Sequence, residues 1–212
     1  MNHSALSYLI AAVVGYLLGS CPNGLIVSRA RGIDIRKHGS GNIGATNVLR
    51  VLGKKLGYLV FALDTAKGLV AVILAYWIVH AVQPAPFHPE LIGIGAGVAC
   101  ILGHTFPVWL GFRGGKGVAT SAGVLLGLMP VAVLSVFVVW LFLFKTTRYV
   151  SVASIGAAVS LPIFVLLYLN FKMLTGPSLL PFSILIAAVV IWRHRSNMQR
   201  LFQGKEQRFD QE

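Results

Sequence analysis

The segment GSGNIGATNVLR, residues 39–50, contains the densest group of residues suited to chemistry in this chain. Its three glycines let backbone N–H groups approach a ligand closely, and turn-like backbone can aim successive N–H groups at one anion. Arg50 adds a permanent positive charge whose planar donors match a phosphate. This first glycine-rich segment therefore predicts an oxyanion- or phosphate-binding loop. Its candidate residues are Ser40, Gly41, Asn42, Gly44, Thr46, Asn47 and Arg50.

Two other interpretations of the first glycine-rich segment need weighing. GSGNIG also matches the dinucleotide-binding pattern G-x-G-x-x-G, but that pattern requires a preceding strand within a βαβ unit. Here an apolar run and a basic loop precede it, so the context argues against a dinucleotide site. The simpler alternative is a polar loop between helices whose glycines only form turns.

A second glycine-rich segment, RGGKGVAT, occupies residues 113–120. It places Lys116 among three glycines at the start of an apolar run, where helix N–H groups and the helix dipole favour an anion. It is not a Walker loop, because the spacing is short and no Ser or Thr directly follows Lys116. The alternative is a loop lysine that extends toward the membrane interface. The candidate residues are Gly114, Gly115, Lys116, Gly117 and Thr120.

The basic tail contains a third polar group. His194, Asn197 and Arg200 follow at intervals of three residues, so they could share one face of a helix. His194 also lies between two arginines, and a role as an interfacial anchor fits equally well. The histidines are scattered and there are only six carboxylates, so the sequence predicts no metal site.

Composition identifies the class of protein that holds these segments. Of the 212 residues, 56% are hydrophobic and only 11% are charged, whereas soluble proteins contain roughly 25% charged residues. Repeated apolar runs near 20 residues predict an all-α, polytopic membrane protein. The net charge of +12 is concentrated in short segments between these runs, which indicates cytoplasmic loops rather than a nucleic-acid surface.

The apolar runs predict a single membrane domain, residues 1–212, with seven helices, the N-terminus outside and the C-terminus in the cytoplasm. Pro130 divides one long run into two; without that division there would be six helices, and Lys145 and Arg148 would lie outside. Residues 81–90 are expected to form an external loop. Asp64 and Lys67, three residues apart, favour an internal structural ion pair over direct catalysis. The expected spans are 5–27, 56–80, 91–109, 117–128, 131–145, 150–169 and 178–195.

Three segments together resemble the cytoplasmic motifs of the bacterial acyl-phosphate-dependent glycerol-3-phosphate acyltransferases, the PlsY family: GSGNIGATNVLR, GHTFPVWLGFRGGKGVAT and RHRSNMQRLFQGKE. The pattern DxxKG at 64–68 and RYVSVAS at 148–154 also fit. The resemblance implies transfer of a fatty acyl group from acyl phosphate to the sn-1 hydroxyl of glycerol 3-phosphate, which gives lysophosphatidic acid and phosphate. It further implies a seven-helix bundle in the bacterial inner membrane, with its active site facing the cytoplasm and with no cofactor, metal or obligatory protein partner.

The resemblance also implies roles for individual residues. Ser40, Arg50 and Lys116 would contact substrate phosphates, and His194 and Asn197 would help to hold glycerol 3-phosphate. The phosphate of the donor would itself accept the hydroxyl proton, which makes His194 a positioning group. The residues that would shape the acyl-phosphate site are Asn42, Gly44, Thr46 and Asn47.

A transporter and a scaffold or lipid-binding subunit are the two alternative classes of function. A transporter for phosphate or an organic anion would place charged groups near the middle of the membrane, often in repeated halves. Here the polar segments gather at one face and no internal repeat is visible, so the sequence favours an enzyme. A scaffold or lipid-binding subunit is the third possibility.

Overall fold

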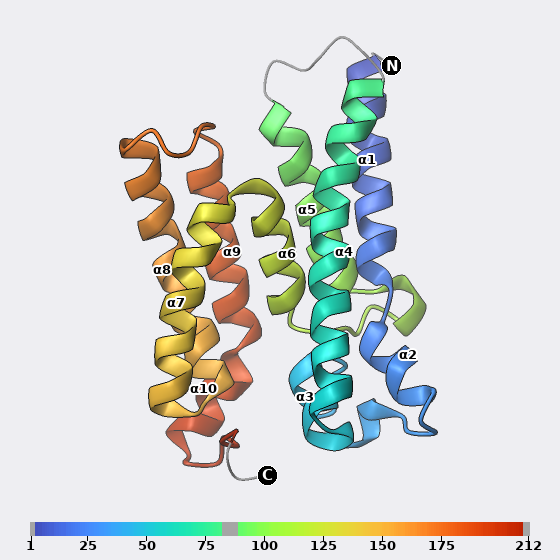
Figure 1. Ribbon diagram of the computed structural model, residues 1–212. Helices are drawn as coiled ribbons and strands as arrows, with labels where there is room; N and C mark the ends of the chain where they lie inside the picture. The colour runs from blue at the N-terminus through green and yellow to red at the C-terminus, as the bar shows by residue number, and fades with distance from the viewer. Residues whose placement is uncertain (1–2, 82–88, 210–212) are drawn as a thin grey trace. The chain divides into compact units, whose positions relative to one another are not determined.

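The computed structural model describes residues 3–81 and 89–209, in which ten α-helices and two short 3₁₀ helices, but no strand, occur (Figure 1). The all-α prediction is therefore confirmed for the described residues. The chain divides into two compact units, Met1–Leu128 and Met129–Glu212, here called unit 1 and unit 2. The predicted external loop at 81–90 lies almost entirely outside the described residues.

Unit 1 is organised around its longest helix, α4, which packs against α1, α3, α5 and α6. Figure 1 shows α2 and α3 at the end of this unit that lies away from the N-terminus of α1. The polar connections are thus gathered at one end of the apolar helices. The helices of unit 1 are α1 (His3–Ser20), α2 (Asn23–Arg29), α3 (Ala45–Leu52), α4 (Lys54–Ala81), α5 (Pro89–Thr105) and α6 (Val118–Leu128), with 3₁₀ helices η1 (Ile35–Lys37) and η2 (Val108–Leu110).

Small residues bring these helices unusually close together. A Cβ atom at Gly15 would meet the carbonyl oxygen of Ala96, and one at Gly19 would meet that of Cys100. Helix α1 therefore packs directly on the backbone of α5. Gly123 allows α6 the same approach to α4. Such small-residue interfaces are typical of helices in lipid, where close packing replaces the hydrophobic effect as the driving force.

Unit 2 consists of α7 (Pro130–Thr147), α8 (Val150–Asn170), α9 (Leu179–Arg193) and α10 (Arg195–Phe202), with α8 packed against both α7 and α9. The chain beyond α10 returns to the end of α7. The N–H of Phe209 donates to the carbonyl oxygen of Arg148 at 2.9 Å, and its ring packs edge-on against Phe144. This return brings the C-terminal segment next to the start of α8.

The predicted run 5–27 is divided into α1 and α2 at Cys21 and Pro22, where the proline has no N–H to continue the helix. Each of the other predicted runs corresponds mainly to one α-helix, and the chain breaks between α6 and α7 beside Pro130, as predicted. Within the described residues, five helical segments are long and apolar enough to cross a membrane, the first of which, Ala5–Arg29, covers α1 and α2; there are up to six if α9 and α10, bent by 51°, form one span. Helix α6 has only 11 residues, about 16 Å, against a hydrocarbon core of about 30 Å. The count of seven spans and the orientation of the termini therefore stay predictions.

The helix contacts in unit 1 predict a sharp difference between two glycines. Gly19→Ala should lower the stability by about 1–3 kcal/mol, because its methyl group would push α1 off the backbone of α5. Gly95→Ala, where no atom lies within 4 Å of the added methyl group, is the matched control and should be neutral or slightly stabilising. Thermal unfolding of both variants in detergent micelles measures the difference. Equal Tm values would contradict the close approach of α1 to α5.

Candidate active site

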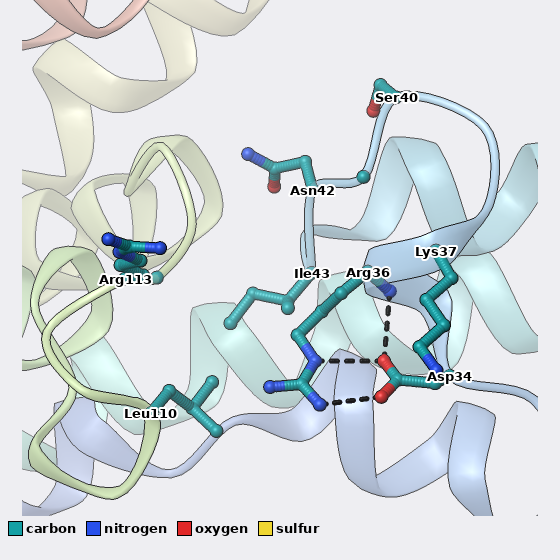
Figure 2. A pocket seen from close by; sticks show the side chains of 10 residues that line it. Asp34, Arg36, Lys37, Ser40, Asn42, Ile43, Leu110 and Arg113 are labelled. Carbon is teal, nitrogen blue, oxygen red and sulfur yellow. Dashed lines mark hydrogen bonds and ion pairs between the residues drawn. The ribbon is translucent and has the colours of Figure 1, made fainter.

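A pocket of about 540 Å³ in unit 1 brings parts of the two glycine-rich segments together (Figure 2). Figure 2 shows Asn42 reaching from its loop toward the side where Arg113 lies on a separate loop. Three cationic side chains and one carboxylate line the pocket, so its charge suits an anionic ligand. The lining residues are Asp34, Arg36, Lys37, Ser40, Gly41, Asn42, Ile43, Leu110, Arg113 and Gly114.

Asn47 holds the first glycine-rich segment in shape from behind. Its side chain is buried, and its Oδ1 accepts a hydrogen bond from the N–H of Ser40 at 2.9 Å. Its Nδ2 donates to the carbonyl oxygens of Asn42 at 2.8 Å and His38 at 3.0 Å. One amide thus fixes three positions, of which Ser40 and Asn42 line the pocket and His38 adjoins it. Asn47 therefore acts on the loop backbone, and its contribution to an acyl-phosphate site stays a prediction.

The backbone of this segment needs glycine at Gly39. Its φ of +57° is left-handed, and a Cβ atom there would collide with the Asn47 side chain. Further along, the Oδ1 of Asn42 accepts a hydrogen bond from the N–H of Gly44 at 2.8 Å, immediately before α3. The loop is thus held by hydrogen bonds at both ends.

Asp34 and Arg36 form a fixed ion pair at the pocket. The Asp34 carboxylate accepts hydrogen bonds from Arg36 Nη2 at 2.6 Å, Nε at 2.9 Å and the backbone N–H at 3.1 Å. The side-chain hydrogen bonds from Arg36 hold the pKa of Asp34 well below its ordinary value, and the same pair raises the pKa of Arg36. Because this carboxylate is already paired, Lys37 and Arg113 leave the pocket with a net positive charge.

The second glycine-rich segment is attached to the end of α5. The N–H groups of Gly114 and Gly115 donate to the carbonyl oxygens of Thr105 and His104, each at 3.0 Å. A Cβ atom at Gly115 would collide with the imidazole of His104. Gly117, with a φ of +80°, then turns the chain into α6. Lys116 therefore lies between Gly115, whose backbone is bonded to α5, and the N-terminus of α6.

A buried charged cluster lies behind this attachment. Lys67 Nζ lies 2.9 Å from Asp64 Oδ1, 3.0 Å from His104 Nδ1 and 2.8 Å from the carbonyl oxygen of Cys21. Asn23 Nδ2 donates to the same carboxylate oxygen at 3.0 Å. The structural ion pair predicted from the spacing of Asp64 and Lys67 is confirmed. What the spacing could not indicate is that His104 joins it.

The structure separates the residues predicted in unit 1 into two groups. Ser40, Gly41, Asn42 and Gly114 line the pocket. Thr120 is fully buried in α6, where its backbone packs on Gly68 of α4. The other predicted residues of unit 1, which are described but do not line this pocket, are Gly44, Thr46, Asn47, Arg50, Gly115, Lys116 and Gly117.

Three cations that line the pocket, Arg36, Lys37 and Arg113, were not among the predicted site residues. Arg113 is the first residue of the second glycine-rich segment, and Arg36 and Lys37 lie three and two residues before the first, so this proximity was the available signal. Basic residues also concentrate in the cytoplasmic loops of membrane proteins because they set the orientation of the chain. Proximity to a glycine-rich segment therefore does not distinguish a cation that binds a ligand from one that only sets this orientation.

His194 and Asn197 lie in unit 2, so their predicted association with the pocket stays a prediction. His194 is buried at the junction of α9 and α10, with Nδ1 at 2.8 Å from the carbonyl oxygen of Val190. Because a carbonyl oxygen only accepts, Nδ1 carries the hydrogen, and Nε2 of a neutral ring is an acceptor. Asn197 Nδ2 donates to Glu206 Oε1 at 2.5 Å.

Glu206 fixes the end of the chain to two helices. It accepts hydrogen bonds from Ser151 Oγ at 2.9 Å and Arg200 Nε at 2.7 Å, besides the one from Asn197. Burial by itself would raise the pKa of Glu206, but these hydrogen bonds and the Arg200 charge outweigh burial and hold the pKa below its ordinary value. Glu206 was not among the predicted site residues, although it is the only acid in the motif RHRSNMQRLFQGKE.

Apolar helices of membrane-spanning length define an integral membrane protein, and the positively charged pocket between two glycine-rich loops of unit 1 is suited to an anion. The family model described as "Glycerol-3-phosphate acyltransferase" matches residues 9–204. The chain belongs to the glycerol-3-phosphate acyltransferase family.

Individual relatives agree along nearly the whole chain. The glycerol-3-phosphate acyltransferases of Rhizobium meliloti and Thermosynechococcus vestitus are 48% and 44% identical, over 95% and 94% of this chain and 92% and 93% of theirs. Two crystal structures of PlsY (YgiH), an integral membrane glycerol 3-phosphate acyltransferase, are also similar. The glycerol 3-phosphate form has a TM-score of 0.83 at 42% identity and 96% coverage of both chains; the lysophosphatidic acid form has 0.81, 41% and 95% of both.

The contacts of Asn47 predict that Asn47→Asp disables the first glycine-rich segment. The carboxylate keeps an acceptor for Ser40 but loses both donors, so it faces carbonyl oxygens that it repels, at a cost of about 1–3 kcal/mol. Acyltransferase activity should fall sharply. Asn170→Asp, the same chemical change at an exposed position at the end of α8, is the control and should retain activity. Full activity of Asn47→Asp would contradict the positioning role.

The lowered pKa of Glu206 predicts a pH-dependent contribution to stability. Because the pKa is lower in the folded than in the unfolded chain, the contribution is present above the ordinary value of 4.5 and is lost as pH falls through the folded pKa. Glu206→Gln should therefore lower the Tm at pH 7, and the difference from the parent protein should shrink as the pH falls below 4.5. Thermal unfolding from pH 7 to pH 3.5 tests this; a constant difference would contradict it.

Proposed function

We propose that this protein transfers a fatty acyl group from acyl phosphate to the sn-1 hydroxyl of glycerol 3-phosphate, giving lysophosphatidic acid and inorganic phosphate. The observation that carries the proposal is the positively charged pocket that joins the two glycine-rich segments, in a chain of this family. The two PlsY structures are a glycerol 3-phosphate form and a lysophosphatidic acid form, which supports the acceptor and the product. The donor, acyl phosphate, follows from the motif resemblance.

The reaction needs two phosphate-bearing molecules to lie side by side. The sn-1 oxygen forms a bond to the acyl carbon, the bond from that carbon to the phosphate oxygen breaks, and the leaving phosphate takes the hydroxyl proton. The donor is already activated, so positioning and stabilisation of the developing oxyanion account for most of the catalysis. Cationic side chains and glycine N–H groups are suited to this task, and no metal or other cofactor is invoked.

The proposed roles follow the two glycine-rich segments. Ser40, Arg50 and Lys116 contact substrate phosphates, and Arg113 and Lys37 add positive charge at the pocket. Residues that shape the site through their backbone or side chains are Gly41, Asn42, Gly44, Thr46, Gly114, Gly115, Gly117 and Thr120. His194 and Asn197 hold glycerol 3-phosphate, and Asn47 positions the first segment. The active site faces the cytoplasm of a bacterial inner membrane, and no protein partner is required.

The decisive experiment is turnover by the purified protein in lipid with glycerol 3-phosphate and palmitoyl phosphate. Phosphate and lysophosphatidic acid should appear in equal amounts, should be insensitive to EDTA and should not form when palmitoyl-CoA replaces the acyl phosphate. Phosphate release without the lipid product would contradict the acceptor. Product from palmitoyl-CoA would contradict the donor, and no product from a folded sample would favour transport of an anion.

Replacing Lys116 tests whether this lysine binds a substrate phosphate or only adds to the positive charge of the protein. Lys116→Ala should reduce turnover by at least 100-fold at an unchanged Tm, because the side chain is half-buried in a loop rather than part of the core. Lys145→Ala removes an exposed lysine in the last turn of α7 and is the matched control, with full activity expected. Arg50→Ala should behave as Lys116→Ala does. Equal activities of Lys116→Ala and Lys145→Ala would contradict the role of Lys116.

A further inference from the structure

The buried cluster of Asp64, Lys67 and His104 lies behind the second glycine-rich segment, and the motif chemistry assigns it no task. All three side chains are at least 93% buried, and they come from the two adjacent helices α4 and α5. A buried ion pair is weak evidence for stability, because the loss of hydration offsets most of the attraction. Its presence at this place therefore calls for a more specific explanation.

The hydrogen bonds of Lys67 account for every donor of its ammonium group. Three acceptors surround Nζ: the Asp64 carboxylate at 2.9 Å, His104 Nδ1 at 3.0 Å and the carbonyl oxygen of Cys21 at 2.8 Å. An ammonium group has three N–H donors, so all three are used within the protein. This lysine is thus committed to structure, in contrast to the role proposed for Lys116.

The same contacts orient the imidazole of His104. Lys67 can only donate, so Nδ1 of His104 accepts, and the hydrogen of the neutral ring is on Nε2. Nε2 is on the side of Gly115: the three atoms nearest to a Cβ added at that glycine all belong to the His104 ring. The backbone of His104 reinforces the contact, because its carbonyl oxygen accepts the Gly115 N–H at 3.0 Å.

We propose that His104, held in place by Lys67 and Asp64, is a positioning residue that fixes the backbone of Gly115 and thereby aims the neighbouring Lys116 at a substrate phosphate. The inference rests on the proposed function, because it assigns a task within the same site. The imidazole acts as a rigid wall behind the loop and does not touch the substrate. The hydrogen bond from Lys67 to Nδ1 prevents the imidazole of His104 from rotating.

The variant His104→Asn tests the packing of the imidazole against Gly115 separately from the contribution of His104 to the fold. The Asn oxygen lies close to the place of Nδ1 and can still accept from Lys67, so the buried ammonium keeps its partners while the ring behind Gly115 is lost. The KM for at least one phosphate-bearing substrate should rise about tenfold, with kcat and the Tm close to those of the parent protein. Cys100→Ala, a buried change one turn earlier on α5 whose thiol contacts the Lys67 carbonyl, is the control and should leave KM unchanged.

A double substitution tests the contact itself. Gly115→Ala alone should raise KM more than His104→Asn does, because its methyl group collides with the ring. In the His104→Asn background that collision is relieved, so the double variant should have a lower KM than Gly115→Ala alone. Independent, multiplicative effects of the two substitutions would overturn the proposal.

The outcomes separate this inference from the proposed function. If the parent protein neither turns over nor gains thermal stability from glycerol 3-phosphate, the proposed function fails. If the parent protein is active and His104→Asn lowers only the Tm, with KM unchanged, His104 is merely structural and this inference fails. If His104→Asn does not fold, Gly115→Ala alone decides. A raised KM at unchanged Tm supports the positioning of Gly115 by the His104 ring, and an unchanged KM overturns it.

Discussion

The ammonium group of Lys67 is the constraint on which the arrangement of unit 1 depends. It is buried among apolar helices, where an ion without partners would cost several kcal/mol, so its three acceptors must stay where they are. Those acceptors lie on the segment after α1, on α4 and on α5. One charge therefore ties together three segments that are distant in the sequence, at the end of the unit where the second glycine-rich segment begins.

Both glycine-rich segments are supported by the same physical device. Asn47 supports the first through hydrogen bonds to its backbone, and His104 supports the second through its ring and its carbonyl oxygen. Neither side chain lines the pocket. Glycine gives a loop the freedom to bring N–H groups to an anion, but the same freedom would let the loop collapse. A buried polar side chain behind each loop removes that freedom without occupying the binding face.

The sequence was sufficient for features that depend on local pattern. The apolar runs, the break beside Pro130 and the pairing of Asp64 with Lys67 follow from hydropathy, proline chemistry and helical spacing. It was not sufficient to separate Asn42 from Asn47, two amides in one short segment, of which one lines the pocket and the other is buried behind it. That difference arises only when η1 and α3 pack together, and no local pattern records it.

For the reaction proposed above, the charge pattern of the pocket bears on where the hydroxyl proton goes. Asp34 is the only carboxylate among its described lining residues, and hydrogen bonds from Arg36 depress the pKa of Asp34. A carboxylate with a depressed pKa is a poor proton acceptor near neutral pH. The phosphate of an acyl donor, by contrast, becomes more basic as its bond to the acyl carbon breaks. In a pocket whose own carboxylate is already paired, the leaving group is the stronger base at the moment when a base is needed.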